Sequence, residues 1–88
     1  MLTTEMTENE KRIIQAVNEI TDSLYNEKKG VLYKIILDAI ERPLIERILE
    51  RTEGNQLMAA RILGMNRNTI RSKIKKLGIN VDKWRVTE

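Results

Sequence analysis

Apolar residues recur along the chain at the three- and four-residue steps of an α-helix, and no segment shows the alternating pattern of a strand. Glycines separate the periodic stretches, at Gly30, Gly54 and Gly64, where they act as helix stops. The pattern therefore predicts an all-α protein of four helices. The predicted helices cover residues 7–26, 31–52, 56–63 and 67–77.

The second predicted helix changes its apolar face at Pro43. Before the proline, the apolar positions cover roughly half of the helix circumference, which is wider than one packing neighbour requires. They are Val31, Leu32, Ile35, Ile36, Ala39 and Ile40. After the proline, the apolar side chains lie on the opposite side of the helix. They are Leu44, Ile45, Ile48 and Leu49. One long helix is thus predicted to serve two different cores.

The wide stripe before Pro43 has more apolar surface than the first helix can cover, so we predict a homodimer. The first two helices of each chain would form an intertwined four-helix core. The expected core residues are Ile13, Val17, Ile20, Leu24, Leu32, Ile35, Ile36 and Ile40. The alternative is that the stripe packs within the monomer against the C-terminal helices.

Residues 54–79 have the pattern of a helix-turn-helix. Gly54 and Gly64 are placed to end helices, and Asn55 and Asn66 to cap the helices that follow them. The short third helix is expected to turn Ala59, Ile62 and Leu63 inward, and the fourth helix Ile70, Ile74 and Leu77. Small Ala60 and a turn of about three residues that contains Gly64 complete the signature. Similar helix pairs also occur in bundles that bind nothing.

Charge is divided unevenly between the two halves of this chain of 88 residues, whose net charge is +3. Residues 1–53 carry 8 basic and 11 acidic side chains, whereas residues 54–88 carry 8 basic and 2 acidic ones. The stretch RILGMNRNTIRSKIKKLG, residues 61–78, has six basic side chains and no acidic one. A solvated helix surface can explain such a run, but a concentrated positive field also suits a polyanion such as nucleic acid.

The first turn of the fourth helix supports the nucleic-acid interpretation. A recognition helix reads bases from this turn, where Arg67 suits guanine and Asn66 suits adenine. Arg71 and Lys73 are placed to contact backbone phosphates, and Asn55 and Gln56 open the third helix with exposed amides. Lys75 and Lys76 fit a phosphate role and a helix-dipole role equally well.

Other classes of function find little support in the sequence. Histidine and cysteine are absent and no glycine-rich phosphate loop is present, so neither an enzyme nor a metal, cofactor or small-molecule site is expected. The start, MLTTEMTENE, does not resemble a signal peptide, and the apolar stretch VLYKIILDAI is too short to span a bilayer. A cytoplasmic protein without a membrane partner is therefore expected. The main rival is a helical adaptor that binds an acidic protein or a membrane surface through the fourth helix.

The segment ERPLIERILERTEGNQLMAARILGMNRNTIRSKIKKLGI, residues 41–79, resembles the C-terminal region of the Fis family (factor for inversion stimulation) and the DNA-binding domains of NtrC-type activators. The resemblance rests on the proline after an acidic-basic pair and on the GNQ, NRNT and KKLG motifs, and it extends over about residues 8–79. It implies a homodimer that bends double-stranded DNA. By carry-over, Asn66 and Arg67 contact bases. The implied backbone contacts are Asn55, Gln56, Thr69, Arg71 and Lys73. Lys76 is added to these contacts because its place at the end of the fourth helix also fits a phosphate.

The chain departs from this family pattern at several positions. Leu57 and Met58 replace a small hydroxyl residue and a basic one, and Ser72 stands where lysine is common. The segment before the first helix is short, which argues against stimulation of a recombinase. Residues 80–88 extend past the family's usual end, and Trp84 is expected to pack back onto the domain.

The sequence thus predicts a sequence-tolerant, DNA-bending homodimer, formed by a single Fis-like domain over residues 1–88. It would act in transcription regulation or nucleoid organisation. The alternative is the dimerisation and DNA-binding fragment of an NtrC-type activator.

Overall fold

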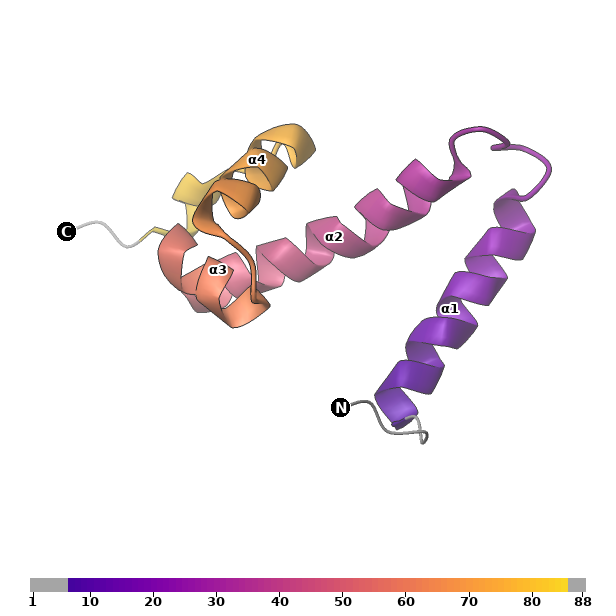
Figure 1. Cartoon of the computed structure of the whole chain (residues 1–88), viewed down its shortest axis with the longest axis horizontal. Coiled ribbons are helices and arrows are strands. Elements are labelled where there is room, and N and C mark those ends of the chain that lie inside the picture. Colours follow the sequence, from indigo (N-terminus) through magenta and orange to yellow (C-terminus); the bar gives the residue numbers. More distant parts are fainter. Residues whose placement is uncertain (1–6, 86–88) are drawn as a thin grey trace. The chain divides into compact units, whose positions relative to one another are not determined.

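A computed structural model describes residues 7–85, which form four α-helices and one short 3-10 helix (Figure 1). The elements are α1 (Glu8–Leu24), α2 (Leu32–Arg51), α3 (Gln56–Leu63), α4 (Arg67–Leu77) and η1 (Val81–Trp84). No strand occurs within residues 7–85, so the predicted all-α fold of four helices is confirmed. The chain divides into two compact units, with the described residues up to Leu37 in one and those from Asp38 onward in the other.

The two short C-terminal helices begin and end at the predicted residues, whereas α1 and α2 are slightly shorter than predicted. α3 and α4 each have an asparagine at the N-cap and a left-handed glycine at the C-cap. α1 instead ends at Tyr25 in a right-handed conformation, and its last turn continues as separate turns through residues 25–31. Helix ends are thus well predicted where strong capping residues stand in the sequence.

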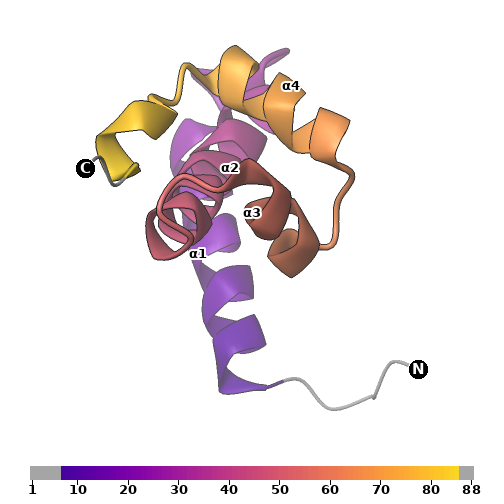
Figure 2. The ribbon, with the colours of Figure 1, turned by 90° about the vertical axis from the view of Figure 1, so that its left-hand side faces the viewer.

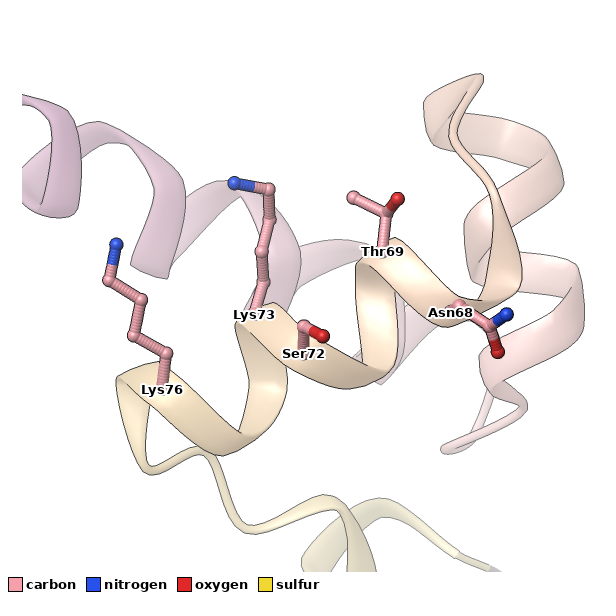
Figure 3. A pocket seen from close by; sticks show the side chains of 5 residues that line it. All are labelled: Asn68, Thr69, Ser72, Lys73 and Lys76. Atoms are coloured by element: carbon pink, nitrogen blue, oxygen red, sulfur yellow. The ribbon is translucent and has the colours of Figure 1, made fainter.

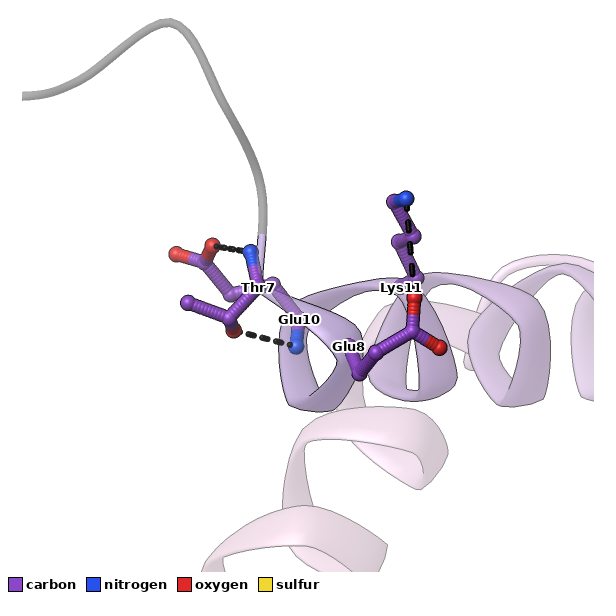
Figure 4. Close-up of polar contacts among 4 residues, drawn as sticks. All are labelled: Thr7, Glu8, Glu10 and Lys11. Carbon is purple, nitrogen blue, oxygen red and sulfur yellow. Dashed lines mark hydrogen bonds and ion pairs between the residues drawn. The ribbon is translucent and has the colours of Figure 1, made fainter.

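A capping box fixes the start of α1 (Figure 4). The Thr7 hydroxyl accepts a hydrogen bond from the Glu10 backbone amide at 3.1 Å, and the Glu10 carboxylate accepts one from the Thr7 amide at 2.8 Å. Two amides at the helix end are satisfied in this way. Lys11 adds an exposed ion pair with Glu8 one turn away. Local side chains alone therefore define where α1 begins.

No residue in the described part of the N-terminal unit, residues 7–37, is fully buried. Among the predicted dimer-core residues, three are exposed: Ile13, Ile20 and Ile40. The other five are half-buried: Val17, Leu24, Leu32, Ile35 and Ile36. Ile40 belongs to the C-terminal unit, and the rest to the N-terminal one. Within one chain these side chains form no closed core, and the dimer that would cover them stays a prediction.

The C-terminal unit has a core built from three helices and the segment that follows them (Figure 2). α2 continues through Pro43 and supplies Ile45 and Leu49, which are almost completely buried. Leu44, expected on the same face, is 49% exposed. The buried core residues are Ile45, Leu49, Ala59, Ala60, Ile70, Ile74, Leu77, Ile79 and Val81.

One inward-facing residue of the third helix was predicted wrongly. Ile62 is 57% exposed, whereas Ala59 and Ala60 are buried and Leu63 packs against the core. At 3.6 residues per turn, Ile62 lies about 100° from the centre of the stripe that these three residues form. An eight-residue helix offers its neighbours only one narrow face, so Ile62 points to solvent.

The segment after α4 folds back onto the C-terminal core. Asn80 caps η1 by accepting a hydrogen bond from the Asp82 amide at 3.1 Å. Val81 is buried in the core and Trp84 packs against it, which confirms the expectation for Trp84. Lys83 Nζ lies 4.7 Å from the centroid of the Trp84 ring. Residues 81–84 are therefore an integral part of the unit.

Candidate nucleic-acid interface

A tight turn sets the angle between α3 and α4. Gly64 has a φ of 75° and donates its amide to the carbonyl oxygens of Ala60 and Arg61. The Met65 amide bonds to the Ala60 carbonyl at 2.9 Å, and the Met65 side chain packs against the core. Because a left-handed φ favours glycine, Gly64 lets the chain reverse here without strain. Buried Ala60 fills little space beside this turn.

Asn66 starts α4 and is held by its own cap. Its side-chain oxygen accepts a hydrogen bond from the Asn68 amide at 2.6 Å. An asparagine that reads adenine uses both its oxygen and its amide nitrogen. The amide nitrogen of Asn66 takes no part in the cap, so Asn66 offers a donor to an acceptor on a base or a phosphate. Arg67, the other predicted base contact, is exposed in the same turn.

The buried stripe of α4 turns the rest of this helix outward. Ile70, Ile74 and Leu77 lie in the core, so polar side chains line the opposite side. Two open depressions follow this surface, one of which is shown in Figure 3. Lys73 and Lys76 extend along one edge of it, and Asn68 lies toward its N-terminal end. The depressions are lined by Asn68, Thr69, Arg71, Ser72, Lys73, Lys75 and Lys76.

Lys73 differs from the other lysines of this surface because it already has an acidic partner. Its Nζ lies 2.9 Å from a carboxylate oxygen of Glu41 on α2, and the two side chains are only 28% and 19% exposed. One residue further along α2, the Arg42 guanidinium donates to the Leu77 carbonyl oxygen at the end of α4. These two contacts tie α4 to α2. Lys76, by contrast, is exposed.

Glu41 and Arg42 were missed by sequence reasoning as residues of this interface. They lie 32 and 35 residues before their partners, and no local spacing rule links positions so far apart. The one available signal was their place directly before Pro43, where the second predicted helix changes its apolar face.

Asn55 and Gln56 open α3 next to an unusual turn. Glu53 and Gly54 both have positive φ, at 55° and 82°, and the Gly54 amide bonds back to the Leu49 carbonyl at 2.8 Å. The Asn55 side-chain oxygen caps α3 by accepting from the Met58 amide at 3.0 Å. Asn55 is exposed and Gln56 is half-buried. The Asn55 amide nitrogen is therefore left as an outward donor, which suits a phosphate oxygen.

Leu57, Met58 and Ile62 give α3 an apolar outer face. The two departures from the family pattern at Leu57 and Met58 are thus solvent-exposed positions, and they add no polar group there. The predicted phosphate contacts of α3 are confined to its first residues.

Two short helices, a left-handed glycine in the turn and an exposed polar second helix define this unit as a helix-turn-helix. A protein-family model described as "Bacterial regulatory protein, Fis family" matches residues 36–77. The chain belongs to the Fis family. Within the part of the chain that the structure describes, no helix is both long and apolar enough to cross a membrane.

Curated relatives support this assignment. The chain is 39% identical to the DNA-binding protein Fis of Glaesserella parasuis over 69 residues, which cover 78% of this chain and 70% of the relative. It is 38% identical to the protein of the same name from Proteus mirabilis over 66 residues, or 75% of this chain and 67% of the relative. With that of Aliivibrio fischeri it shares 47% identity over 49 residues, covering 56% and 50% of the two chains. No solved structure matches the chain at a significant level.

Proposed function

We propose that this chain is a homodimeric, non-enzymatic DNA-binding protein that bends DNA and acts in transcription regulation or in organising the bacterial nucleoid. The observation that carries the proposal is the outward surface of α4. Its buried stripe and the Asn66 cap present a row of basic and amide side chains on a rigid helix. The name shared by the relatives, DNA-binding protein Fis, supports the same partner.

In this proposal, the first turn of α4 enters the major groove. Arg67 pairs with a guanine edge, because its planar donors match the two acceptors O6 and N7. Asn66 donates from its amide nitrogen to a neighbouring base. The backbone contacts would be Asn55, Gln56, Thr69, Arg71, Lys73 and Lys76. Of these, Lys73 would have to exchange Glu41 for a phosphate, whereas Arg71 and Lys76 are already exposed.

The uncovered apolar faces of α1 and α2 support the proposed homodimer. Large apolar side chains such as Ile13 and Ile20 stay in water in a single chain, and a second copy would bury them. Two recognition helices that belong to one rigid dimer would then bind two neighbouring major-groove segments. DNA whose sequence bends easily would be favoured, so part of the site preference comes from DNA deformability.

Fluorescence anisotropy with a labelled duplex of about 27 base pairs tests the proposal across a salt series. We expect a steep fall of affinity with salt, because each subunit displaces several phosphate counterions. Arg67→Ala should remove the preference among duplexes, at a loss of about 1–3 kcal/mol for each contact, whereas Lys76→Ala should weaken all duplexes evenly.

Two further measurements separate the proposal from its rivals. A flat salt response, or equally tight binding to anionic vesicles, would contradict DNA binding and favour a surface adaptor. Energy transfer between dyes on the two duplex ends should rise on binding if the DNA bends. An unchanged transfer efficiency at saturation would contradict DNA bending but would leave the proposed DNA binding standing.

A further inference from the structure

The C-terminal segment lies directly against the turn between α2 and α3. Gly54 in this turn is buried, and a Cβ added there would lie 2.9 Å from Arg85 Cγ and 3.3 Å from the Val81 carbonyl oxygen. The aliphatic part of the Arg85 side chain therefore covers Gly54. Residue 54 directly precedes Asn55, the N-cap of α3. Residues at the two ends of the helix-turn-helix thus meet at one place on the surface.

The charged end of Arg85 is held only weakly by its acidic neighbour. Arg85 Nη1 lies 3.3 Å from Asp82 Oδ1, and the two side chains are 55% and 78% exposed. Exposed ion pairs of this kind contribute about 0–1 kcal/mol, so a stronger anion can displace the carboxylate. A phosphate suits the guanidinium well, because its oxygens match the two parallel donors.

We infer that Arg85 is a further DNA-backbone contact, which binds a phosphate next to those contacted by Asn55 and Gln56. The inference rests on the proposed DNA binding. Arg85 places a positive charge at this edge of the domain and so lengthens the contacted DNA beyond the reach of α4.

Lys83 provides a matched control on the same segment. It has the same charge as Arg85, but its Nζ lies over the Trp84 ring. With Trp84 it lines a groove whose other residues come from α2. They are Pro43, Glu46, Arg47 and Glu50. Lys83 therefore faces a surface that carries carboxylates rather than the start of α3.

The test compares Arg85→Gln with Lys83→Gln in the duplex titration across salt. Glutamine keeps the Cγ that covers Gly54, so Arg85→Gln should leave the thermal unfolding midpoint unchanged. We expect Arg85→Gln to lower the salt slope by about 1 for each subunit and to weaken binding several-fold at low salt, on the order of one lost phosphate contact. Arg85→Lys should keep the slope, and Lys83→Gln should bind like the wild type.

A double-mutant cycle with Asp82 sharpens the test. Asp82→Asn removes the carboxylate that competes for Arg85, so it should tighten DNA binding in the wild-type background and much less in the Arg85→Gln background. Equal gains in DNA affinity in both backgrounds would overturn the inference. So would an Arg85→Gln variant with the same affinity and salt slope as Lys83→Gln, in a protein whose wild type shows a steep fall of affinity with salt. A wild type without salt-dependent DNA binding would overturn the proposed function as well, so the two failures are distinguishable.

Discussion

The two units of this chain contain similar fractions of apolar residues but use them differently. In the C-terminal unit, nine apolar residues from α2, α3, α4 and the following segment close into one core. In the described part of the N-terminal unit, α1 and the start of α2 are well-formed helices, yet none of their residues is fully buried. One unit is complete within a single chain, and the other has helices without a core.

This difference indicates that the two units depend on different sources of stability. Helices without a packed core are marginal in water, because most helical stability in proteins comes from burial of an apolar face. The helix-turn-helix unit gains its stability from its own core. In the proposed homodimer the N-terminal unit would gain its stability from a second chain, so its stability should depend on protein concentration.

The largest effect is expected in the core of the C-terminal unit. Leu49→Ala removes a side chain that is 0% exposed and leaves a cavity among α2, α3 and α4. Such a change costs about 2–5 kcal/mol. Chemical denaturation should show this loss at every protein concentration tested, together with a loss of DNA binding. Leu57→Ala, on the exposed face of α3, is the control and should unfold at nearly the wild-type denaturant concentration.

The second effect concerns the N-terminal unit. Ile20→Asp places a carboxylate on the apolar face of α1. A dimer would bury this charge without a cation to pair with it, which is costly. Dimerisation should weaken by roughly 100-fold or more, or about 3 kcal/mol, as measured by analytical ultracentrifugation. Asn18→Asp adds the same charge to another face of α1 and should leave the dimer intact. A wild type that sediments as a monomer would contradict the contrast between the units.

Sequence reasoning succeeded where the determinants of structure are local. The asparagine caps and left-handed glycines that bound α3 and α4 are adjacent in sequence to the helices they end, so these boundaries were predicted to the residue. The narrow stripe of Ile70, Ile74 and Leu77 was equally plain, and all three residues are buried.

Sequence reasoning failed where the surroundings of a side chain come from distant parts of the chain. Ile62 has the right residue type for a core position, but the neighbours of a two-turn helix cover only one narrow side of it. Lys73 has the sequence context of an exposed lysine, and only the packing of α2 against α4 brings Glu41 to its ammonium group. The candidate DNA-binding surface was therefore predicted as a set of positions, without contacts such as the ion pair between Glu41 and Lys73.

A third, smaller effect is expected at the turn that joins α2 to α3. Gly54→Ala forces an alanine into a φ of 82° and directs its Cβ toward Arg85 and the Val81 backbone. We expect a loss of about 1–2 kcal/mol in the free energy of unfolding, because positive φ strains a residue with a Cβ. Gly78 is the control in the same unit, since its φ is also positive, at 68°, but nothing lies within 4 Å of the added Cβ.

Comparing the two alanine variants separates backbone strain from steric conflict. Both should lose stability through φ, and Gly54→Ala should lose more because it also displaces the C-terminal segment. If the two variants were equally stable, the packing of residues 81–85 on this turn would contribute nothing measurable.

The smallest effect concerns the ion pair between Glu41 and Lys73. Breaking this pair tests whether Lys73 serves to hold α4 on α2 or to contact DNA. Glu41→Gln should lower the free energy of unfolding by less than about 1 kcal/mol, because the pair is partly solvated. If Lys73 contacts a phosphate, the same variant should bind DNA two- to threefold more tightly, roughly the gain from removing one competing charge.

Glu50→Gln is the matched control for this last comparison, because it removes the same charge from α2. Glu50 pairs with exposed Arg47 and not with Lys73. A gain in DNA affinity specific to Glu41→Gln, lost again in the double variant with Lys73→Ala, would place Lys73 on the DNA surface. Equal affinities for Glu41→Gln and Glu50→Gln would instead assign Lys73 to the packing of α4 on α2. The phosphate contacts of this helix would then come from Thr69, Arg71 and Lys76 at its exposed positions.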